Sequence, residues 1–325
     1  MTAPLLQVQD LRMHFPVKEG VFQRARKVCR AVDGVSLSLP AGRTIGLVGE
    51  SGCGKSTLGK CIVRLHQPTS GTIRFLDTEL ASLSPGRLKP HRRNLQMIFQ
   101  DPVESLNARH MVGEILAEPF LIHGMGDAPW RRRKVLELLD KVGLPANAAE
   151  RYPFEFSGGQ RQRIGIARAI ALEPKLIVCD EPVSALDVSI QSQVLNLMLD
   201  LQREMGLSYL FIAHNLAVVK HVSDQVAIMY LGRIVELADA DDIYKNARHP
   251  YTRALISAIP QPNPRHRQKR IVLTGDVPSP INPPSGCPFH PRCPHATDRC
   301  RTEVPALRPA PGAEGHTVSC HYDLP

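Results

Sequence analysis

The sequence predicts an α/β protein built on a mostly parallel β-sheet. Over most of the chain, short apolar segments of strand length alternate with segments whose apolar residues recur at helical spacing. A glycine-rich turn follows the apolar segment 44–48, and the apolar segment 176–179 ends on Asp180 and Glu181. Strands that alternate with helices are typical of a parallel sheet, and such sheets bind ligands at the carboxyl ends of their strands.

The first part of the chain predicts strands before the first helix. Residues 5–8 and 35–39 alternate between apolar and polar side chains, as half-buried strands do. The segment 18–30 between them is basic, and we expect it to be an exposed loop. The segment 44–48 predicts a buried strand, and the pattern then becomes helical over 55–65.

The middle of the chain predicts a helical insertion, after which the strand–helix alternation returns. Residues 105–153 show helical periodicity and carry a basic face at 131–134. The elements predicted after this insertion are a helix over 159–171, a strand over 176–179, a helix over 190–204 and a strand over 209–212. These elements extend the parallel sheet.

The composition changes after about residue 259. The segment 260–325 is rich in proline and poor in apolar runs, and it has a basic stretch at 265–270. Such a segment cannot build much core of its own. We expect a tail, a linker or a small segment that is held by something other than hydrophobic burial.

Composition excludes several classes of protein. The chain has 325 residues, of which 43% are hydrophobic and 22% charged, so it is not wholly disordered, collagen-like or a coiled coil. No segment approaches the roughly 20 apolar residues of a membrane helix, and no signal peptide is visible, so a cytoplasmic protein is expected. The net charge of +9 suits a polyanionic partner, but it does not distinguish a nucleotide, a nucleic acid and an anionic membrane.

The glycine-rich turn matches a phosphate-binding loop. The segment Gly49-Glu-Ser-Gly-Cys-Gly-Lys-Ser-Thr57 fits the pattern G-x-x-x-x-G-K-[ST], between a predicted strand and a predicted helix. Glycines let several backbone N–H groups point at phosphate oxygens, and the start of the helix adds its positive dipole end. In this pattern Lys55 reaches the β- and γ-phosphates of a nucleotide, and the Ser56 hydroxyl binds Mg²⁺.

Two further motifs complete a candidate hydrolytic site. Asp180 follows a wholly apolar strand and is placed to hold Mg²⁺, and Glu181 is placed to orient an attacking water. The segment Phe156-Ser-Gly-Gly-Gln160 opens a predicted helix and is a second anion-binding helix start. One phosphate loop and a second such helix start predict a composite site, with the second half donated to another subunit.

The order of these motifs resembles that of the ATP-binding-cassette ATPases over about residues 5–245. The motifs that carry the resemblance are the phosphate loop, Gln100, Ser157-Gly-Gly-Gln160, Asp180-Glu181, Asp187 and His214. The resemblance implies a nucleotide-binding domain over 1–259 with a RecA-like parallel core, antiparallel N-terminal strands and a helical subdomain at about 105–158. It also implies a small cysteine-rich extension over 260–325, and ATP sandwiched between two subunits that face each other head to tail.

The resemblance assigns roles to individual residues. Glu181 and His214 would be catalytic, and His214 would touch the γ-phosphate. An aromatic side chain near the N-terminus would stack on adenine, and Phe15 fits best, with Phe22 as the competitor. Ser56, Gln100 and Asp180 would hold Mg²⁺, and Asp187 would couple the two sites. The implied ATP-binding residues are Phe15, Gly49, Ser51, Gly52, Cys53, Gly54, Lys55, Ser56, Thr57, Gln100, Ser157, Gly158, Gly159, Gln160 and Asp187.

A narrower resemblance points to the F-type ATPases of dipeptide and oligopeptide permeases. It rests on the segments 31–36, 46–53, 99–102, 184–189 and 249–252 and on the cysteine-bearing tail. It implies a related D-type ATPase subunit as partner, two transmembrane permease subunits, and an extracytoplasmic peptide-binding protein that acts indirectly. The protein would lie peripherally on the cytoplasmic face of the inner membrane and power peptide import.

Two alternatives stay open. The same mechanism could serve another cargo, such as nickel, glutathione or another small solute, because this chain does not itself contact cargo. A soluble ATPase that acts on nucleic acid or ribosomes would also suit the net charge of +9. The chain lacks the second cassette, the coiled-coil insertion and the zinc insertion that such proteins usually carry, so no nucleic-acid partner is expected.

Four of the eight cysteines, Cys287, Cys293, Cys300 and Cys320, fall in the last forty residues. In a reducing compartment such a cluster indicates metal ligation rather than disulfides. Thiolates suit zinc and an iron–sulfur cluster equally well, but paired C-x2-C spacings typical of structural zinc are absent. By resemblance to the tails of peptide-permease ATPases we expect a [4Fe–4S] cluster with a structural role, and zinc as the second choice.

Overall fold

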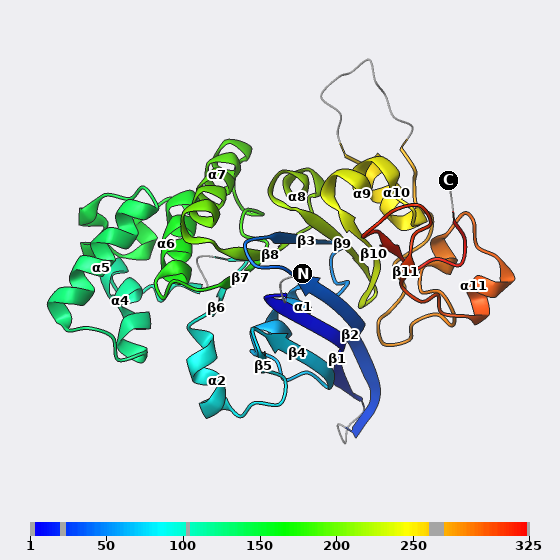
Figure 1. Ribbon diagram of the computed structural model, residues 1–325, viewed down its shortest axis with the longest axis horizontal. Helices are drawn as coiled ribbons and strands as arrows, with labels where there is room; N and C mark the ends of the chain where they lie inside the picture. Colours follow the sequence, from blue (N-terminus) through cyan, green and yellow to red (C-terminus); the bar gives the residue numbers. More distant parts are fainter. Residues whose placement is uncertain (1–3, 20–23, 102–104, 260–269, 324–325) are drawn as a thin grey trace, which may run out of the picture. The chain divides into compact units, whose positions relative to one another are not determined.

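A computed structural model describes residues 4–19, 24–101, 105–259 and 270–323. The chain forms two compact units (Figure 1). One unit contains residues 1–40, 44–82 and 213–325, and the other contains residues 41–43 and 83–212. They are called the first and the second unit below.

The N-terminal part of the first unit is an antiparallel sheet. Its strands are β1 (Leu6–Glu19), β2 (Arg24–Leu39), β4 (Ser70–Phe75) and β5 (Thr78–Glu79), in the order β2-β1-β4-β5. The apolar side chains of the alternating segments are buried, including Leu6, Val8, Leu37 and Leu39. The prediction of half-buried strands at both ends of this region is therefore correct.

The prediction of a loop over 18–30 is wrong. Residues 18–19 belong to β1 and residues 24–30 belong to β2, and the two strands pair as far as Glu19 opposite Arg24. The backbone groups of this basic segment are satisfied by the antiparallel ladder.

The first unit also holds a second group of strands with its helices. These strands are β3 (Thr44–Val48), β9 (Gln225–Tyr230), β10 (Arg233–Asp239), β11 (Arg308–Pro309) and β12 (Thr317–Val318). Adjacent strands follow the order β11-β12-β10-β9-β3, and only β3 and β9 are parallel. The helices are α1 (Lys55–Ile62), α8 (Leu216–Val222), α9 (Ala240–Asn246), α10 (Pro250–Ser257), the 3₁₀ turn η3 (His290–Arg292) and α11 (Asp298–Thr302).

The second unit contains a parallel sheet and the helical segment. Its strands are β6 (Leu95–Ile98), β7 (Leu176–Asp180) and β8 (Ser208–Ala213), in the order β6-β7-β8. Its helices are α2 (Pro85–Arg92), α4 (Val112–Ile122), α5 (Ala128–Lys141), α6 (Gly158–Ile170) and α7 (Val188–Met205), with the 3₁₀ turns η1 (Ala146–Glu150) and η2 (Pro153–Glu155). All residues of β7 and β8 are buried, as expected of central parallel strands.

The C-terminal segment 270–323 packs within the first unit. Phe289 is 1% exposed, and its ring lies 5.3 Å from that of Tyr230 and 5.5 Å from that of Tyr251. Strand β12 pairs with β10, and the backbone N–H of Arg30 donates to the carbonyl of Pro280 at 3.0 Å. The domain boundary near residue 259 and the subdomain limits at 105–158 stay predictions.

No helix among the described residues is both long and apolar enough to cross a membrane.

Candidate functional site

The phosphate loop lies between a buried strand and a helix in the first unit. All five residues of β3 are buried, and the loop that follows them leads into α1 at Lys55. Gly54 caps the helix with φ of +107°, which residues with a Cβ rarely adopt. The sequence prediction of strand, glycine turn and helix is correct at this point.

Two glycines of the loop have no room for a side chain. A Cβ on Gly49 would lie 2.1 Å from the carbonyl oxygen of Met229, and a Cβ on Gly54 would lie 1.9 Å from that of Ala31. Both contacts are to backbone atoms of β9 and β2, which cannot move aside cheaply. The neighbouring strands therefore fix the backbone conformation of the loop, and a preformed phosphate-binding loop needs such support.

Lys55 is held at the loop. Its side chain is buried, and its Nζ donates hydrogen bonds to the carbonyls of Gly49 at 2.8 Å and Glu50 at 3.0 Å. Ser56 and Thr57 follow in the first turn of α1. A fixed ammonium, a glycine cradle and a helix start fit the binding of a phosphate chain.

Glu50 of this loop contacts the C-terminal part of the same unit. Its backbone N–H donates to the hydroxyl of Tyr251 at 2.9 Å. Its carboxylate accepts two hydrogen bonds from Arg292, at 2.7 and 3.0 Å. The hydrogen bonds to Glu50 raise the pKa of the Arg292 guanidinium further above its usual value. The sequence analysis did not single out Glu50 or Arg292 as site residues. The only signal in the sequence is that Glu50 lies in the phosphate loop and that Arg292 directly precedes Cys293 in the tail.

The acidic residues lie at the end of a parallel strand in the second unit. Asp180 is the last residue of β7 and is 2% exposed. Glu181 has φ of +47°, and its backbone N–H donates to the carbonyl of Ile212 at 3.0 Å. The Gln100 amide nitrogen lies 3.3 Å from a carboxylate oxygen of Glu181. The structure thus brings the side chains of Gln100 and Glu181 together.

The Ser157 segment forms the start of α6. The Ser157 hydroxyl accepts from the backbone N–H of Gln160 at 3.3 Å, and the Gln160 side chain accepts from the backbone N–H of Ser157 at 3.0 Å. This reciprocal pair is a capping box. Ser157, Gly158 and Gln160 are exposed, so the helix start is open to another molecule. Asp187, which caps α7, is exposed as well.

The two remaining predicted contacts with nucleotide lie in the first unit. His214 follows β8 directly and is exposed. Phe15 lies in β1, is partly buried, and makes an edge-to-face contact with His66 at 5.6 Å between ring centroids. The competing Phe22 lies outside the described residues. The ATP-binding and catalytic roles of these residues stay predictions.

The predicted iron–sulfur cluster is wrong. Cys287, Cys293, Cys300 and Cys320 line one cavity of about 20 Å³, but no group of three or more His, Cys, Asp or Glu residues in the described part of the chain is arranged to hold a metal ion. The same result gives the zinc alternative no support. Burial raises the pKa of Cys287 to about 11 and raises the pKa of Cys293 and Cys320 above that of an ordinary thiol.

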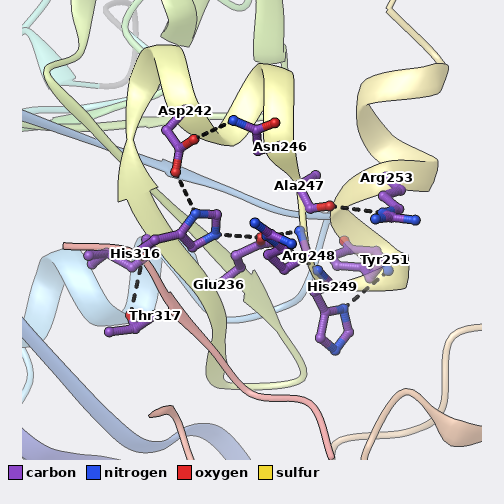
Figure 2. A network of polar contacts seen from close by, with 11 residues as sticks. Glu236, Asp242, Asn246, Ala247, Arg248, His249, Tyr251, Arg253, His316 and Thr317 are labelled. Atoms are coloured by element: carbon purple, nitrogen blue, oxygen red, sulfur yellow. Dashed lines mark hydrogen bonds and ion pairs between the residues drawn. The ribbon is translucent and has the colours of Figure 1, made fainter. Parts of the chain in front are cut away.

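The order of the tail has another source. Phe289 packs among aromatic rings, and Arg292 is paired with Glu50. His316 lies within hydrogen-bond distance of two carboxylates, Glu236 at 2.8 Å and Asp242 at 2.6 Å (Figure 2). Hydrophobic packing and buried ion pairs therefore do what the metal centre was expected to do.

Comparison with known proteins supports this reading of the fold and the loops. The model of the ABC transporter family matches residues 32–184, and the model of the oligopeptide/dipeptide transporter C-terminal region matches residues 235–300. The dimeric structure of MJ0796, a bacterial ABC transporter cassette, covers 72% of this chain and 98% of its own, with a TM-score of 0.65 and 26% identity. The fold and the phosphate loop thus define an ABC-type nucleotide-binding domain.

Full-length relatives narrow the class. The oligopeptide transport ATP-binding protein AppF of Bacillus subtilis is 52% identical, over 98% of this chain and 97% of that protein. The oligopeptide transport ATP-binding protein OppF of Escherichia coli is 54% identical, over 97% and 95%. The dipeptide transport ATP-binding protein DppF of E. coli is 51% identical, over 98% and 94%. This chain belongs to the family of oligopeptide and dipeptide ABC transporter ATP-binding proteins.

Proposed function

We propose that this chain is the ATP-hydrolysing subunit that powers an ABC importer of oligopeptides or dipeptides. The observation that carries the proposal is the identity of about 50% to peptide-transport ATP-binding proteins over nearly the whole chain. The match of the C-terminal region to the oligopeptide/dipeptide transporters supports the same cargo class. Nickel, glutathione and nucleic acid are not favoured by any of these relatives.

The chemistry assigned to the site is hydrolysis of the γ-phosphate of ATP. Lys55 and the N–H groups of the loop bind the phosphates, and Phe15 stacks on adenine. Ser56, Gln100 and Asp180 are the residues assigned to Mg²⁺, which would neutralise phosphate charge. Glu181 orients the attacking water and accepts hydrogen bonds from it. The Lys55 ammonium, held at the loop by two backbone carbonyls, supports this assignment.

The proposed assembly is a pair of ATPase subunits on a membrane permease. A related D-type subunit completes the site at the phosphate loop of this chain. The ATP on the phosphate loop of that subunit meets the exposed Ser157 helix start of this chain. Two transmembrane subunits form the pathway, and an extracytoplasmic peptide-binding protein delivers cargo. The chain lies on the cytoplasmic face of the membrane as a peripheral subunit. Closing and opening of the ATPase pair drives alternating access in the permease.

A direct test separates this function from a soluble one. The full chain is expressed with and without its permease subunits, and membranes and ribosomes are separated. We expect to find the chain in the membrane fraction only when the permease is present. We also expect this fraction to hydrolyse ATP, and we expect peptide import to depend on that ATPase activity. A chain that stays with ribosomes in both cases would contradict the proposal. Lys55→Ala serves as the control, because it removes the phosphate-binding ammonium and should abolish ATP binding and import together.

A further inference from the structure

A tail residue holds the acidic side chain of the phosphate loop. The two Arg292–Glu50 hydrogen bonds, at 2.7 and 3.0 Å, form a bidentate pair. The Arg292 side chain is 7% exposed and that of Glu50 is 27% exposed, so the pair is largely shielded from water. The two residues are 242 positions apart in the chain, and both lie in the first unit.

The rest of Glu50 is fixed as well. Its backbone N–H donates to Tyr251, and its carbonyl accepts from the Lys55 ammonium. Tyr251 in turn packs against Phe289, which directly precedes the 3₁₀ turn that carries Arg292. The tail therefore reaches the loop through both the backbone and the side chain of one residue. That residue also receives a hydrogen bond from the lysine that is to bind phosphate.

Charge explains why such a pair matters at this place. A loop that binds a triphosphate is disfavoured by a carboxylate of its own, because like charges a few ångströms apart repel strongly where water is excluded. Glu50 is the second residue of the loop and carries such a carboxylate. The guanidinium of Arg292 neutralises it and fixes its direction.

We propose that Arg292 is a positioning residue for the nucleotide, which neutralises and orients Glu50 so that the phosphate loop accepts ATP. The inference rests on the proposed function of the loop. It assigns the C-terminal segment a part in ATP binding, because Arg292 supplies the countercharge for the Glu50 carboxylate. Loss of the pair leaves the Glu50 carboxylate uncompensated beside the bound anion.

The main experiment measures the Kd of a non-hydrolysable ATP analogue with Mg²⁺ for the purified full chain by calorimetry. We expect Arg292→Ala to weaken binding roughly tenfold at low ionic strength, because one partner of a shielded charge pair is removed. A Kd of Arg292→Ala within about twofold of the wild-type value would contradict the role of Arg292.

A second change tests whether Glu50 carries the effect. Glu50→Gln in the Arg292→Ala background removes the unpaired charge, and we expect Kd to return to within about twofold of the wild-type value. Arg292→Lys keeps the charge and loses the bidentate geometry, so its Kd should fall between those of wild type and Arg292→Ala. If Arg292→Ala does not fold, Arg292→Lys with and without Glu50→Gln gives the same comparison. Failure of Glu50→Gln to restore binding would overturn the proposal.

Matched controls distinguish this effect from a loosened tail. Arg299→Ala breaks another arginine–glutamate pair of the tail, with Glu303 at 2.8 Å, far more exposed than the Arg292 pair. His316→Gln loosens the tail at the contacts drawn in Figure 2, without removing a charge from the loop. Both should bind the analogue as wild type does, and a loss equal to that of Arg292→Ala would assign Arg292 a structural role only.

The same measurements keep the two proposals apart. If the wild type does not bind the analogue, or Lys55→Ala binds it equally well, the proposed function of the loop fails. If the wild type binds, Lys55→Ala does not, and Arg292→Ala binds as the wild type does, only the role of Arg292 fails.

Discussion

Glu181 shows how one residue is prepared for its proposed task. Its φ of +47° lies in the left-handed region, which costs a non-glycine residue energy and persists only where neighbours impose it. Two neighbours hold Glu181 here. Its backbone N–H donates to the carbonyl of Ile212, and the side-chain amide of Gln100 lies 3.3 Å from its carboxylate. The sequence placed Glu181 correctly after the apolar strand, but backbone strain could not be predicted from it.

Glu181→Gln should leave ATP binding intact and lower turnover by at least about 100-fold in the assembled transporter. The amide has nearly the shape of the carboxylate, but it does not accept a proton or polarise water as a carboxylate does. ATP affinity by calorimetry and phosphate release in the same preparation check both parts. Near-normal phosphate release would rule out Glu181 as the residue that orients the water. Glu173→Gln, which changes an exposed glutamate between α6 and β7, is the matched control.

At the scale of elements, predictions succeeded where the pattern within a single segment determines the structure of that segment. The apolar runs of β3, β7 and β8 are buried throughout because central parallel strands are covered on both faces. The hairpin of β1 and β2 was missed in the basic segment because its order comes from pairing between strands, which a single segment does not reveal. The tail was misjudged for a similar reason, since Phe289 and Arg292 find partners far away in the chain.

The contacts of His316 are the clearest example of elements that are distant in the sequence and pair in the fold. The imidazole lies next to β12 and bridges Glu236 of β10 and Asp242 of α9, and its side chain is fully buried (Figure 2). Glu236 also accepts from the backbone N–H groups of Arg248 and His249. The hydrogen bond to Glu236, opposed by burial and aided by Asp242, raises the pKa of His316. The two ion pairs need a doubly protonated ring.

The His316 contact makes the stability of the protein depend on pH. Because the folded pKa of His316 lies above its unfolded value near 6.5, its contribution is fully present below that value and is lost as pH rises through the folded pKa. We expect His316→Gln to lower the free energy of unfolding by roughly 2–3 kcal/mol at pH 6 and by less at pH 9. Denaturant titrations of both proteins at the two pH values measure this, and an equal loss at both would contradict a charged ring.

Buried His249 titrates in the opposite sense and must be separated in the same titrations. Burial lowers the pKa of His249 to about 4, and its ring nitrogen accepts from the backbone N–H of Tyr251 at 3.1 Å. Its neutral form is favoured in the folded protein, so stability falls as pH drops from about 6.5 towards 4. Of the two pH values chosen for His316, pH 9 lies above this range and pH 6 lies at its upper end. Because both proteins contain His249, its contribution cancels in the difference between the free energies of unfolding of wild type and His316→Gln.

At the scale of the whole molecule, the Ser157 helix start supports the proposal of a site shared between two chains. The capping box already satisfies the backbone N–H groups of Ser157 and Gln160, while both residues remain exposed. An ordered helix start with its N-terminus open to solvent is suited to an anion that another subunit brings. Nothing in the alternation of strands and helices could predict this. The prediction came from finding one phosphate loop and two anion-binding helix starts.

Partner subunits should therefore raise the ATPase rate, and Ser157 should carry that increase. We expect slow hydrolysis by the purified chain and a rate at least about tenfold higher after the partner ATPase and the permease are added. Ser157→Asp keeps a good helix-capping residue but sets a negative charge against the partner's phosphates, so it should abolish the increase. Ser157→Asn caps equally well without the charge and should retain more of it. Phosphate release from the four preparations decides, since equal rates for the Asp and Asn variants, or a rate that partners do not change, would exclude the shared site.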